Sequence, residues 1–282
     1  MQTIPDSSVL RQGLSSSWVA RQFESDAHAD LLADLDVLFT RPECEVIKDQ
    51  NKIKIGRVPV EIGGRLIQVY VKRYNAFSRR YRLLSLFRQS EACRSWRGAA
   101  LLSQAGFNVG EPLAAVEHRA FGMLQKSFYL SAEIVGALTV DAFWECKANE
   151  IKGKELWRLQ KRLIDELAHL FNSLHANSVY HRDLKDANIL VQDEEARRYY
   201  FTDLDQVIAL PRLSWRRKIK NLVQLNRTLG KKFSSGRRLT FLKEYLAQDY
   251  RDKTERRRWI RKILRQSRRA DQRSLAKANR ND

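Results

Sequence analysis

The chain has 282 residues, of which 43% are hydrophobic and 30% are charged. This composition is typical of a folded globular protein rather than a disordered one. No apolar run approaches the roughly 18 residues of a transmembrane helix, and the first residues lack the basic start and apolar core of a secretory signal. The three cysteines are far apart in the sequence, which argues against a disulfide framework and a zinc site and fits a reducing cytoplasm.

The net charge of +19 is unevenly distributed along the chain. Residues 212–282 carry +18, whereas the first 211 residues carry only +1. Such an asymmetry predicts an anionic partner for the C-terminal quarter, which could be a membrane surface, a nucleic acid or an acidic substrate.

The first half of the chain has mainly β character. Residues 1–40 are expected to form a helical or loosely ordered extension, because Leu31, Leu32, Leu35 and Phe39 have helical spacing. Alternating β-branched residues then predict strands, with a turn at Gly63 and Gly64, and a single helix interrupts them. The strands are expected at 44–50, 52–62, 65–74, 111–119 and 128–135, and the helix at 91–104, closed by Gly106.

The second half is mainly helical. Seven apolar residues on one face predict a buried helix over 156–175. Two short strands are expected at 188–191 and 198–203, around a polar turn, and basic helices follow at about 213–229, 238–247 and 254–270. In the last of these, Trp259, Ile260, Ile263 and Leu264 stand beside many arginines, which fits either packing on the helical lobe or contact with a membrane.

This order of elements predicts an α+β fold of two lobes. Residues 41–135 are expected to form a β-rich N-lobe with one helix, after the extension over 1–40. Residues 136–282 are expected to form a short, mainly helical C-lobe. The change of composition near Glu133 predicts a hinge, and a cleft between the lobes is a common place for a ligand.

The sequence His-Arg-Asp-Leu-Lys-Asp-Ala-Asn at residues 181–188 matches every fixed position of the kinase catalytic loop H-R-D-L-x-x-x-N. The chain here resembles the protein-kinase-like superfamily. Phosphoryl transfer requires an aligned acceptor hydroxyl and neutralisation of the developing negative charge. The resemblance implies that Asp183 accepts the hydroxyl proton, that Lys185 lies near the transferred phosphate, and that Asn188 binds Mg²⁺. A polar loop after the 156–175 helix is the structural alternative.

Two further stretches support a kinase. In "FTDLDQV", Asp203 follows a short strand, where kinases place a magnesium-binding aspartate before Phe-Gly. Leu204 and Asp205 replace that Phe-Gly, and Asp205 is read equally as a further ligand or as a turn residue. In "VYVKRY", Lys72 resembles the strand lysine that contacts the α- and β-phosphates of ATP.

Two expected kinase features are incomplete. No G-x-G-x-x-G precedes Lys72, and the nearest glycine is Gly56, so a loop covering the phosphates would have to use other backbone amides. Glu91 lies in the helix that should carry the glutamate partner of Lys72, although spacing within the helix points nearer to Ser95. Glu91 is therefore a candidate cofactor-binding residue whose alternative role is a favourable charge in the first helical turn.

The type of kinase is narrowed by what surrounds the motifs. Only 77 residues follow Asp205 and Ala-Pro-Glu is absent, which argues against a typical protein kinase, and Arg182 argues against antibiotic and choline kinases. The stretches "VYVKRY", "RSWRGAALLSQAGFNVGEPLAAVE", "YHRDLKDANILV", "FTDLDQV", "RRKIKNLVQLNRTLG" and "RRLTFLKEYL" resemble the bacterial lipopolysaccharide core kinases, the Kdo and heptose kinase family.

This resemblance implies an ATP- and Mg²⁺-dependent carbohydrate kinase, a phosphotransferase with an alcohol group as acceptor. The acceptor would be a Kdo or heptose hydroxyl of the lipopolysaccharide inner core, a glycolipid at the cytoplasmic face of the inner membrane. The enzyme would then be cytoplasmic and peripheral on that membrane, and its basic C-terminal region would contact the anionic surface. The alternatives are a small atypical protein kinase and, less favoured because Lys72, Asp183, Asn188 and Asp203 are all present, a nucleic-acid-binding protein with a degenerate kinase fold.

Overall fold

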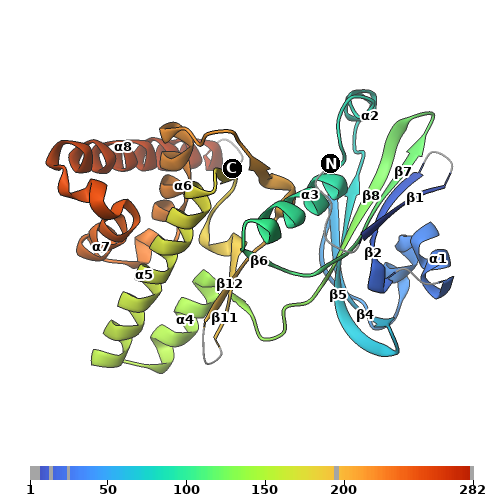
Figure 1. The fold of residues 1–282 in the computed structure, drawn as a ribbon, viewed down its shortest axis with the longest axis horizontal. Helices are drawn as coiled ribbons and strands as arrows, with labels where there is room; N and C mark the ends of the chain where they lie inside the picture. The colour runs from blue at the N-terminus through green and yellow to red at the C-terminus, as the bar shows by residue number, and fades with distance from the viewer. Residues whose placement is uncertain (1–6, 13–14, 24–25, 194–196, 280–282) are drawn as a thin grey trace. The chain divides into compact units, whose positions relative to one another are not determined.

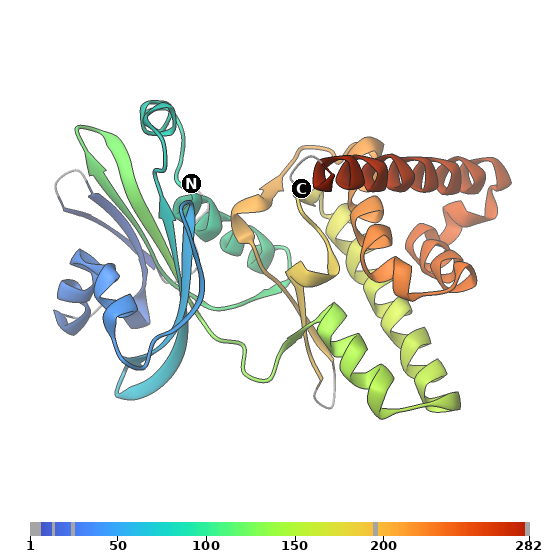
Figure 2. The same cartoon turned by 180° about the vertical axis from the view of Figure 1, so that it is seen from behind.

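The computed structural model describes residues 7–12, 15–23, 26–193 and 197–279. The chain divides into two compact units: unit 1 contains residues 1–136 and 200–207, and unit 2 contains residues 137–199 and 208–282. The boundary after Gly136 lies close to the expected hinge at Glu133. Figures 1 and 2 show the elements of both units from opposite sides.

Unit 1 is built on a seven-stranded antiparallel sheet with the order β1-β2-β7-β8-β5-β4-β3. The expected turn at Gly63 and Gly64 joins β4 to β5, and both glycines have positive φ angles, 57° and 75°. All five strands expected in this region are present. The strands are β1 (Ser7–Gln12), β2 (Ser15–Ala20), β3 (Glu45–Gln50), β4 (Ile53–Ile62), β5 (Arg65–Asn75), β7 (Pro112–Ala120) and β8 (Met123–Ala132).

The expectation of a helical extension over residues 1–40 is wrong for the first part of that segment. Strands β1 and β2 form a hairpin, and β2 pairs with β7 between Ser16↔Glu117 and Val19↔Ala114, so the segment extends the sheet. Backbone hydrogen bonds to the edge of β7 decide this structure, and a short serine-rich stretch gives little sign of them. Helical structure begins only afterwards, in η1 (Arg21–Phe23), α1 (Asp26–Ala33) and η2 (Leu35–Thr40).

The two faces of this sheet are covered by different elements. One face packs on η1, α1 and η2 through a core that includes Phe23, Leu35 and Leu38 from these elements and Val69 and Val71 from β5. The other face is covered by α3 (Glu91–Gln104), which lies on the opposite side of the sheet from α1 in Figure 1. The helix begins at the N-cap Ser90 and closes at Gly106, whose φ is 81°, so its predicted bounds are confirmed.

Unit 2 is mainly helical, as predicted. The long α5 (Gly153–Ala176) buries Leu163, Leu167 and Phe171 along one face, which confirms the expected buried helix. The three basic helices are also present, and α8 continues beyond its expected end near residue 270. The helices are α4 (Val140–Glu150), α5, η3 (Asp186–Asn188), α6 (Trp215–Arg227), η5 (Leu229–Lys232), α7 (Ser235–Leu246), η6 (Ala247–Arg251) and α8 (Lys253–Ala278).

The short strands of the second half complete the elements. In unit 2, β11 pairs antiparallel with β9 through Leu190↔Thr139 and Val191↔Leu138. In unit 1, Tyr200 and Phe201 at the end of β12 pair in parallel with Asn108 and Val109 of β6. Part of the polar turn expected between β11 and β12, residues 194–196, lies outside the described residues. The bounds are β6 (Asn108–Val109), β9 (Leu138–Thr139), β10 (Val179–His181), β11 (Ile189–Gln192), β12 (Arg198–Phe201) and β13 (Val207–Ala209). Two short elements of unit 1, α2 (Arg79–Leu84) and η4 (Leu204–Gln206), precede α3 and follow β12 respectively.

Helix α8 packs its apolar side on the rest of unit 2. Trp259 is buried against Trp215 and Tyr245, and Ile260, Ile263 and Leu264 line an apolar cavity shared with α5, α6 and α7. Packing on the helical lobe therefore describes Trp259, Ile260 and Ile263, whereas Leu264 is 40% exposed. None of the helices in the described ranges combines the length and apolar composition that crossing a bilayer requires.

Candidate active site

The candidate site residues fall into two groups, one in each unit. In unit 1, Lys72 lies on β5, whose alternation buries Val69 and Val71 on the face toward α1 and turns Lys72 to the opposite face. The Lys72 ammonium donates a hydrogen bond to Asp203 Oδ1 at 3.0 Å. The Lys72 side chain is 18% exposed and that of Asp203 46% exposed, so the pair remains accessible to a phosphate group or a cation.

The backbone at Asp203 is held in an unusual conformation. Its φ and ψ angles are 50° and 51°, in the left-handed region, which aspartate tolerates better than most residues do. The residue lies directly before η4, two positions after Phe201 ends β12. A non-glycine residue in this region costs on the order of 1 kcal/mol or more, and such strain is concentrated at functional sites.

Helix α3 fixes the segment that carries Asp203 through a close backbone contact at Gly98. A Cβ atom built on Gly98 would lie 2.1 Å from the carbonyl oxygen of Leu204 and 3.3 Å from Val207 Cβ. The absence of a side chain at Gly98 therefore lets α3 contact η4 directly. Strand β6, which follows α3, pairs with β12 before Asp203, and α3 itself contacts η4 after Asp203. The segment that carries Asp203 is therefore held on both sides.

Asp205, two residues further on, is buried and close to other charges. Burial raises the pKa of its carboxyl to about 6, and the neighbouring negative charge of Asp203 adds to this effect. Arg94 of α3 lies 3.9 Å from Asp205 Oδ2, and Gln206 donates a hydrogen bond to the same oxygen. The structure therefore gives Asp205 polar partners of its own, and its role as a metal ligand stays a prediction.

Glu91 is in the first turn of α3, as expected, but its partners are other than Lys72. It accepts a hydrogen bond from the Tyr81 hydroxyl and forms an ion pair with Arg94 at 3.0 Å. Ser95, the position indicated by helix spacing, has its hydroxyl 3.4 Å from that of Tyr74 on β5. The structure thus joins Lys72 to Asp203 and Glu91 to Arg94, and a contact of Glu91 with a cofactor stays a prediction.

Gly56, the glycine nearest to the expected phosphate loop, has a packing role. A Cβ atom at Gly56 would lie 2.9 Å from Cys44 Sγ and 3.0 Å from the Phe39 ring. The missing side chain thus makes room for η2 and for the residue that precedes β3.

In unit 2, the second group lies on the catalytic-loop segment between β10 and β11. The Lys185 ammonium is 3.0 Å from Asp183 Oδ2. The side-chain amide of Asn188 donates to the backbone carbonyl of Asp183 at 2.7 Å and to its carboxylate at 3.1 Å. The structure therefore brings all three predicted residues of this loop together.

Helix α6 supports this loop with two polar residues that the sequence motif does not include. Gln224 donates to the carbonyl of Arg182 at 2.9 Å and to Asp183 Oδ1 at 3.3 Å, and its own carbonyl accepts from the amide of Leu184 at 3.2 Å. Asn221, which is fully buried, donates to the carbonyl of His181 at 2.7 Å. These contacts fix the backbone on both sides of Asp183.

The support extends to the helical core through His175 of α5. Its Nε2 is 3.0 Å from Asn221 Oδ1, and its Nδ1 is 2.8 Å from the Tyr245 hydroxyl. Since the Asn221 amide nitrogen already donates elsewhere, Oδ1 accepts from Nε2–H, and Nδ1 accepts from the tyrosine. Burial lowers the pKa of His175 to about 4, so the ring is neutral in this network. The sequence indicates these residues only as polar positions on the buried faces of two helices.

Each of the two groups offers an oxygen donor of the kind that binds Mg²⁺ together with nucleotide phosphates. Carboxylate and amide oxygens are hard ligands, and Mg²⁺ is usually held by one or two carboxylates together with phosphate oxygens and water. Asp203 offers a partly exposed carboxylate. Within the described ranges, no three His, Cys, Asp or Glu side chains gather as a self-sufficient metal site.

Comparisons with known proteins identify the fold and the family of the chain. The structure resembles a solved structure described as WaaP in complex with acyl carrier protein, with a TM-score of 0.61, 17% identity, and coverage of 87% of this chain and 97% of that one. It also resembles, with a TM-score of 0.41, a Stt7 homologue from Micromonas algae soaked with ATP, which is 18% identical and covers 60% of this chain and 51% of that one. The first likeness confirms the two-lobed kinase-like fold.

The curated protein sequences contain no match to this chain. A family model, in contrast, matches residues 39–245, which is more than half of the chain and includes every predicted site residue. The family is described as the lipopolysaccharide kinase (Kdo/WaaP) family. The chain therefore belongs to the lipopolysaccharide kinase (Kdo/WaaP) family, and it is a phosphotransferase that acts on a sugar hydroxyl.

Proposed function

We propose that the protein transfers the γ-phosphoryl group of ATP to a Kdo or heptose hydroxyl of the lipopolysaccharide inner core, at the cytoplasmic face of the inner membrane. The observation that carries this proposal is the catalytic-loop group of Asp183, Lys185 and Asn188 within a chain of the lipopolysaccharide kinase family. The Kdo or heptose identity of the sugar is the part that experiment must decide.

Each residue of the two groups has a role in this reaction. Asp183 accepts the proton of the acceptor hydroxyl and holds its oxygen in line with the phosphorus, and Lys185 neutralises charge on the transferred group. Lys72 binds the α- and β-phosphates, and its present partner Asp203 is then available for a cation. Asn188 and Asp203 would hold Mg²⁺, which supplies charge neutralisation of the phosphates when bound. Asn221 and Gln224 position the Asp183 backbone.

The direct test is transfer of labelled phosphate from ATP and Mg²⁺ to dephosphorylated core acceptors that end in Kdo alone or in Kdo with heptose. Label on one glycan, abolished in Asp183→Ala, supports the proposal and identifies the sugar. Asp165→Ala, on exposed α5 surface in the same unit, is the matched control and should retain activity. Label on a generic protein acceptor, with none on either glycan, would instead indicate the atypical protein kinase.

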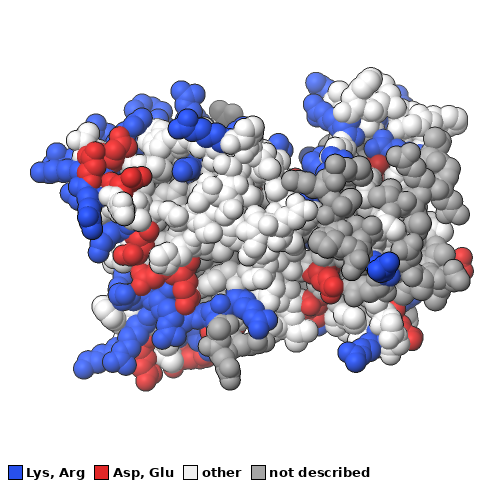
Figure 3. Space-filling view, in the orientation of Figure 1, with Lys and Arg blue, Asp and Glu red and all other residues white. Residues whose placement is uncertain are grey.

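The proposal includes peripheral attachment to the anionic membrane through the C-terminal region. Helix α8 carries a basic groove of about 460 Å³, and Figure 3 shows Lys and Arg atoms along the edge where Figure 1 places this helix. We call it the α8 groove, and its residues are Trp215, Thr254, Arg257, Arg258, Arg261, Lys262 and Arg265. Each basic residue near an anionic bilayer contributes on the order of 1 kcal/mol of attraction.

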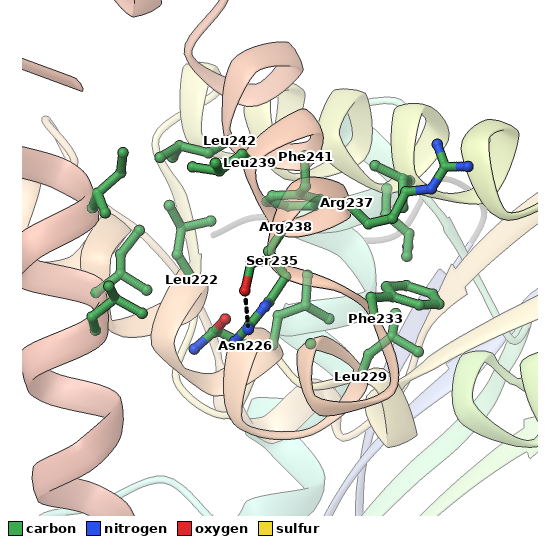
Figure 4. Close-up of a pocket in the computed structure, with 17 residues that line it drawn as sticks. Leu222, Asn226, Leu229, Phe233, Ser235, Arg237, Arg238, Leu239, Phe241 and Leu242 are labelled. Atoms are coloured by element: carbon green, nitrogen blue, oxygen red, sulfur yellow. Dashed lines mark hydrogen bonds between the residues drawn. The ribbon is translucent and has the colours of Figure 1, made fainter. Parts of the chain in front are cut away.

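An acyl carrier protein is a second candidate partner, favoured by a cavity in unit 2. The cavity has a volume of about 230 Å³ and is lined by apolar side chains of α5, α6, η5, α7 and α8 (Figure 4). Arg237 and Arg238 stand at its edge, and Arg238 donates to Ser235 at 3.1 Å. WaaP, which has the same fold, was solved with acyl carrier protein. An apolar cavity beside arginines fits an acyl chain on an acidic carrier.

This partner can be tested by binding of acylated and unacylated acyl carrier protein to the full chain. The acylated form should bind more tightly, and Leu242→Trp, which fills the cavity, should remove that difference. Leu239→Ala would serve as a milder change in the same lining. Equal affinity for both forms, or no binding, would exclude an acyl site in this cavity.

A further inference from the structure

Unit 1 exposes a group of large apolar side chains at one end of its sheet. Phe87 and Phe121 are 88% and 90% exposed, and Leu83 and Leu86 are 60% and 44% exposed. Leu83 is in α2, Leu86 and Phe87 follow it, and Phe121 is in the turn between β7 and β8. We call these four side chains the apolar tip. Figures 1 and 2 both show α2 and the β7–β8 turn at the same end of the sheet.

The two segments of the apolar tip are fixed to one another. The hydroxyl of Ser85 accepts from the backbone amide of Leu124 at 2.9 Å, and the carbonyl of Ser85 accepts from Arg119 at 3.1 Å. Arg119 also donates to the carbonyl of Gly122 at 3.0 Å. A Cβ atom on Gly122 would be 3.3 Å from Leu86. The apolar tip is thus an ordered surface. Its apolar side chains face solvent, and hydrogen bonds of Ser85 and Arg119 fix its backbone.

The hairpin turn imposes a positive φ on Phe121, a conformation that a bulky side chain adopts only at a cost. Ala120 pairs with Met123, so Phe121 and Gly122 form a two-residue turn, and their φ angles are 51° and 77°. The first position of such a turn favours Asn, Asp or Gly, and a bulky side chain there is a genuine outlier. An exposed phenylalanine at this position gains no burial within the chain, which indicates that it contacts something else.

The segment that carries most of the apolar tip contains only positive charges. Residues 75–90 contain Arg79, Arg80, Arg82 and Arg88 and no Asp or Glu. All four arginines are exposed, and no described carboxylate is paired with Arg79, Arg80 or Arg88. Aromatic and leucine side chains surrounded by arginines are the composition of surfaces that insert into the boundary between lipid headgroups and acyl chains.

We propose that the apolar tip inserts into an anionic lipid surface, with Phe87 and Phe121 entering the acyl boundary and the surrounding arginines contacting lipid phosphates. The proposed partner is a bilayer rather than a protein groove, because the four side chains lie on a turn, on α2 and on the loop after it, and all of them are exposed to solvent. This inference rests on the proposed function in one respect: a glycolipid acceptor explains why a kinase would contact a lipid surface. It concerns unit 1, and it is distinct from attraction of the basic C-terminal region.

The experiment is sedimentation of the full chain with phosphatidylcholine vesicles that contain or lack phosphatidylglycerol, without ATP. Phe87→Ala with Phe121→Asn should lower affinity for the anionic vesicles by at least roughly 100-fold, as expected for loss of two buried aromatic groups. Leu66→Ala, which removes another exposed apolar side chain of unit 1 (73% exposed), should leave the affinity unchanged. Wild-type affinity in the double variant would overturn the proposal.

Two further readouts separate lipid contact from a structural role. Phe121→Asn relieves the left-handed strain, so this variant should unfold at the same or a higher temperature while binding vesicles less well. After subtraction of the wild-type emission from the six native tryptophans, a Phe87→Trp probe should show a blue-shifted emission with vesicles and quenching by brominated acyl chains, whereas Leu66→Trp should not. A Phe87→Trp probe that remains in water while the protein is bound would also overturn the proposal.

Vesicle binding and phosphoryl transfer can be measured separately, so failure of this proposal can be distinguished from failure of the proposed function. Asp183→Ala should lose phosphoryl transfer yet sediment with vesicles like the wild type. The Phe87→Ala, Phe121→Asn variant should phosphorylate lipid-free core oligosaccharide at the wild-type rate. Loss of transfer to the soluble acceptor in this variant would mean that the tip acts through the active site, which contradicts lipid contact as its role.

Discussion

At the scale of single residues, the two candidate cofactor-binding residues of unit 1 have different partners. Lys72 is bonded to Asp203 at 3.0 Å, whereas Glu91 is engaged by Tyr81 and Arg94. Lys72→Met should therefore raise the KM for ATP roughly 10- to 100-fold, the range expected for a lost hydrogen bond to a charged group. Glu91→Gln should raise the KM for ATP less than about 3-fold, because Glu91 pairs with Arg94 rather than with Lys72. Arg94 would keep a second carboxylate nearby, that of Asp205. Steady-state kinetics with varied ATP would measure both.

The reverse order, with Glu91→Gln more harmful than Lys72→Met, would mean that Glu91 leaves Arg94 and reaches Lys72 when nucleotide binds. Circular dichroism of both variants is the control, since each must retain the folded unit for the comparison to hold.

The residues that the sequence predicted are those that short sequence motifs identify. Asp183, Lys185 and Asn188 lie within six positions, and one turn of backbone brings them together. Lys72 and Asp203 were each indicated by their position on or after a strand, although the ion pair between them required the fold. Asn221 and Gln224 were not predicted, because their contacts with the loop arise only when α6 packs beside it.

At the scale of elements, helix α3 and η4 depend on one glycine. The Cβ of Ala at position 98 would lie 2.1 Å from the Leu204 carbonyl, so Gly98→Ala should force α3 and η4 apart. We expect an activity loss of at least roughly 10-fold and a lower free energy of unfolding by about 1–3 kcal/mol, the usual cost of overpacking. Activity and urea unfolding would be measured together.

The matched control is Gly236→Ala in α7, where the nearest atom to an added Cβ is 3.9 Å away. This change should leave activity intact and slightly stabilise the helix. Wild-type activity in Gly98→Ala would show that the position of Asp203 does not depend on the contact between α3 and η4.

The buried His175 gives the helices of unit 2 a predictable pH dependence. Its pKa is lowered to about 4 by burial, below the ordinary value of about 6.5. The unfolded chain therefore binds a proton more readily, so the stability of the neutral ring is present above pH 6.5 and is lost as the pH falls toward 4. A shift of this size corresponds to about 3 kcal/mol.

Urea unfolding between pH 7.5 and 4.5 should show this loss in the wild type and a flatter curve in His175→Gln, which has no proton to gain. His169→Gln, an exposed histidine on the same helix, should keep the wild-type slope. A slope in His175→Gln as steep as in the wild type would assign the pH dependence to other groups.

Helices and strands were predicted correctly where buried apolar residues repeat with a clear period. They were missed where hydrogen bonding to a distant strand decides the structure. Helices α3 and α5 were found because each buries one continuous face. Strands β1 and β2 were missed because their place in the sheet depends on hydrogen bonding to β7. The short helix α4 was missed although Val140, Phe143 and Trp144 have helical spacing, because three apolar residues within about one turn are too short a repeat to identify a helix.

At the scale of the whole molecule, charge and apolar surface are separable contributions to membrane contact. Nearly all of the net charge, +18 of +19, belongs to residues 212–282. Arg261 and Lys262 line the α8 groove, and neither is paired with a carboxylate among the described residues. Their attraction to lipid phosphates is a surface effect, so it should weaken sharply as salt shortens the Debye length from about 10 Å at 0.1 M to about 3 Å at 1 M.

Replacing both residues, Arg261→Glu with Lys262→Glu, should therefore reduce affinity for anionic vesicles at 0.1 M salt by roughly 10-fold or more and change little at 1 M. Lys154→Glu with Arg158→Glu, at the exposed start of α5, changes the net charge equally and is the matched control. If the control loses as much affinity, net charge rather than the α8 groove attracts the membrane. Because the Phe87 and Phe121 side chains contribute through burial rather than charge, the binding that remains at 1 M salt should be the part that their substitutions remove.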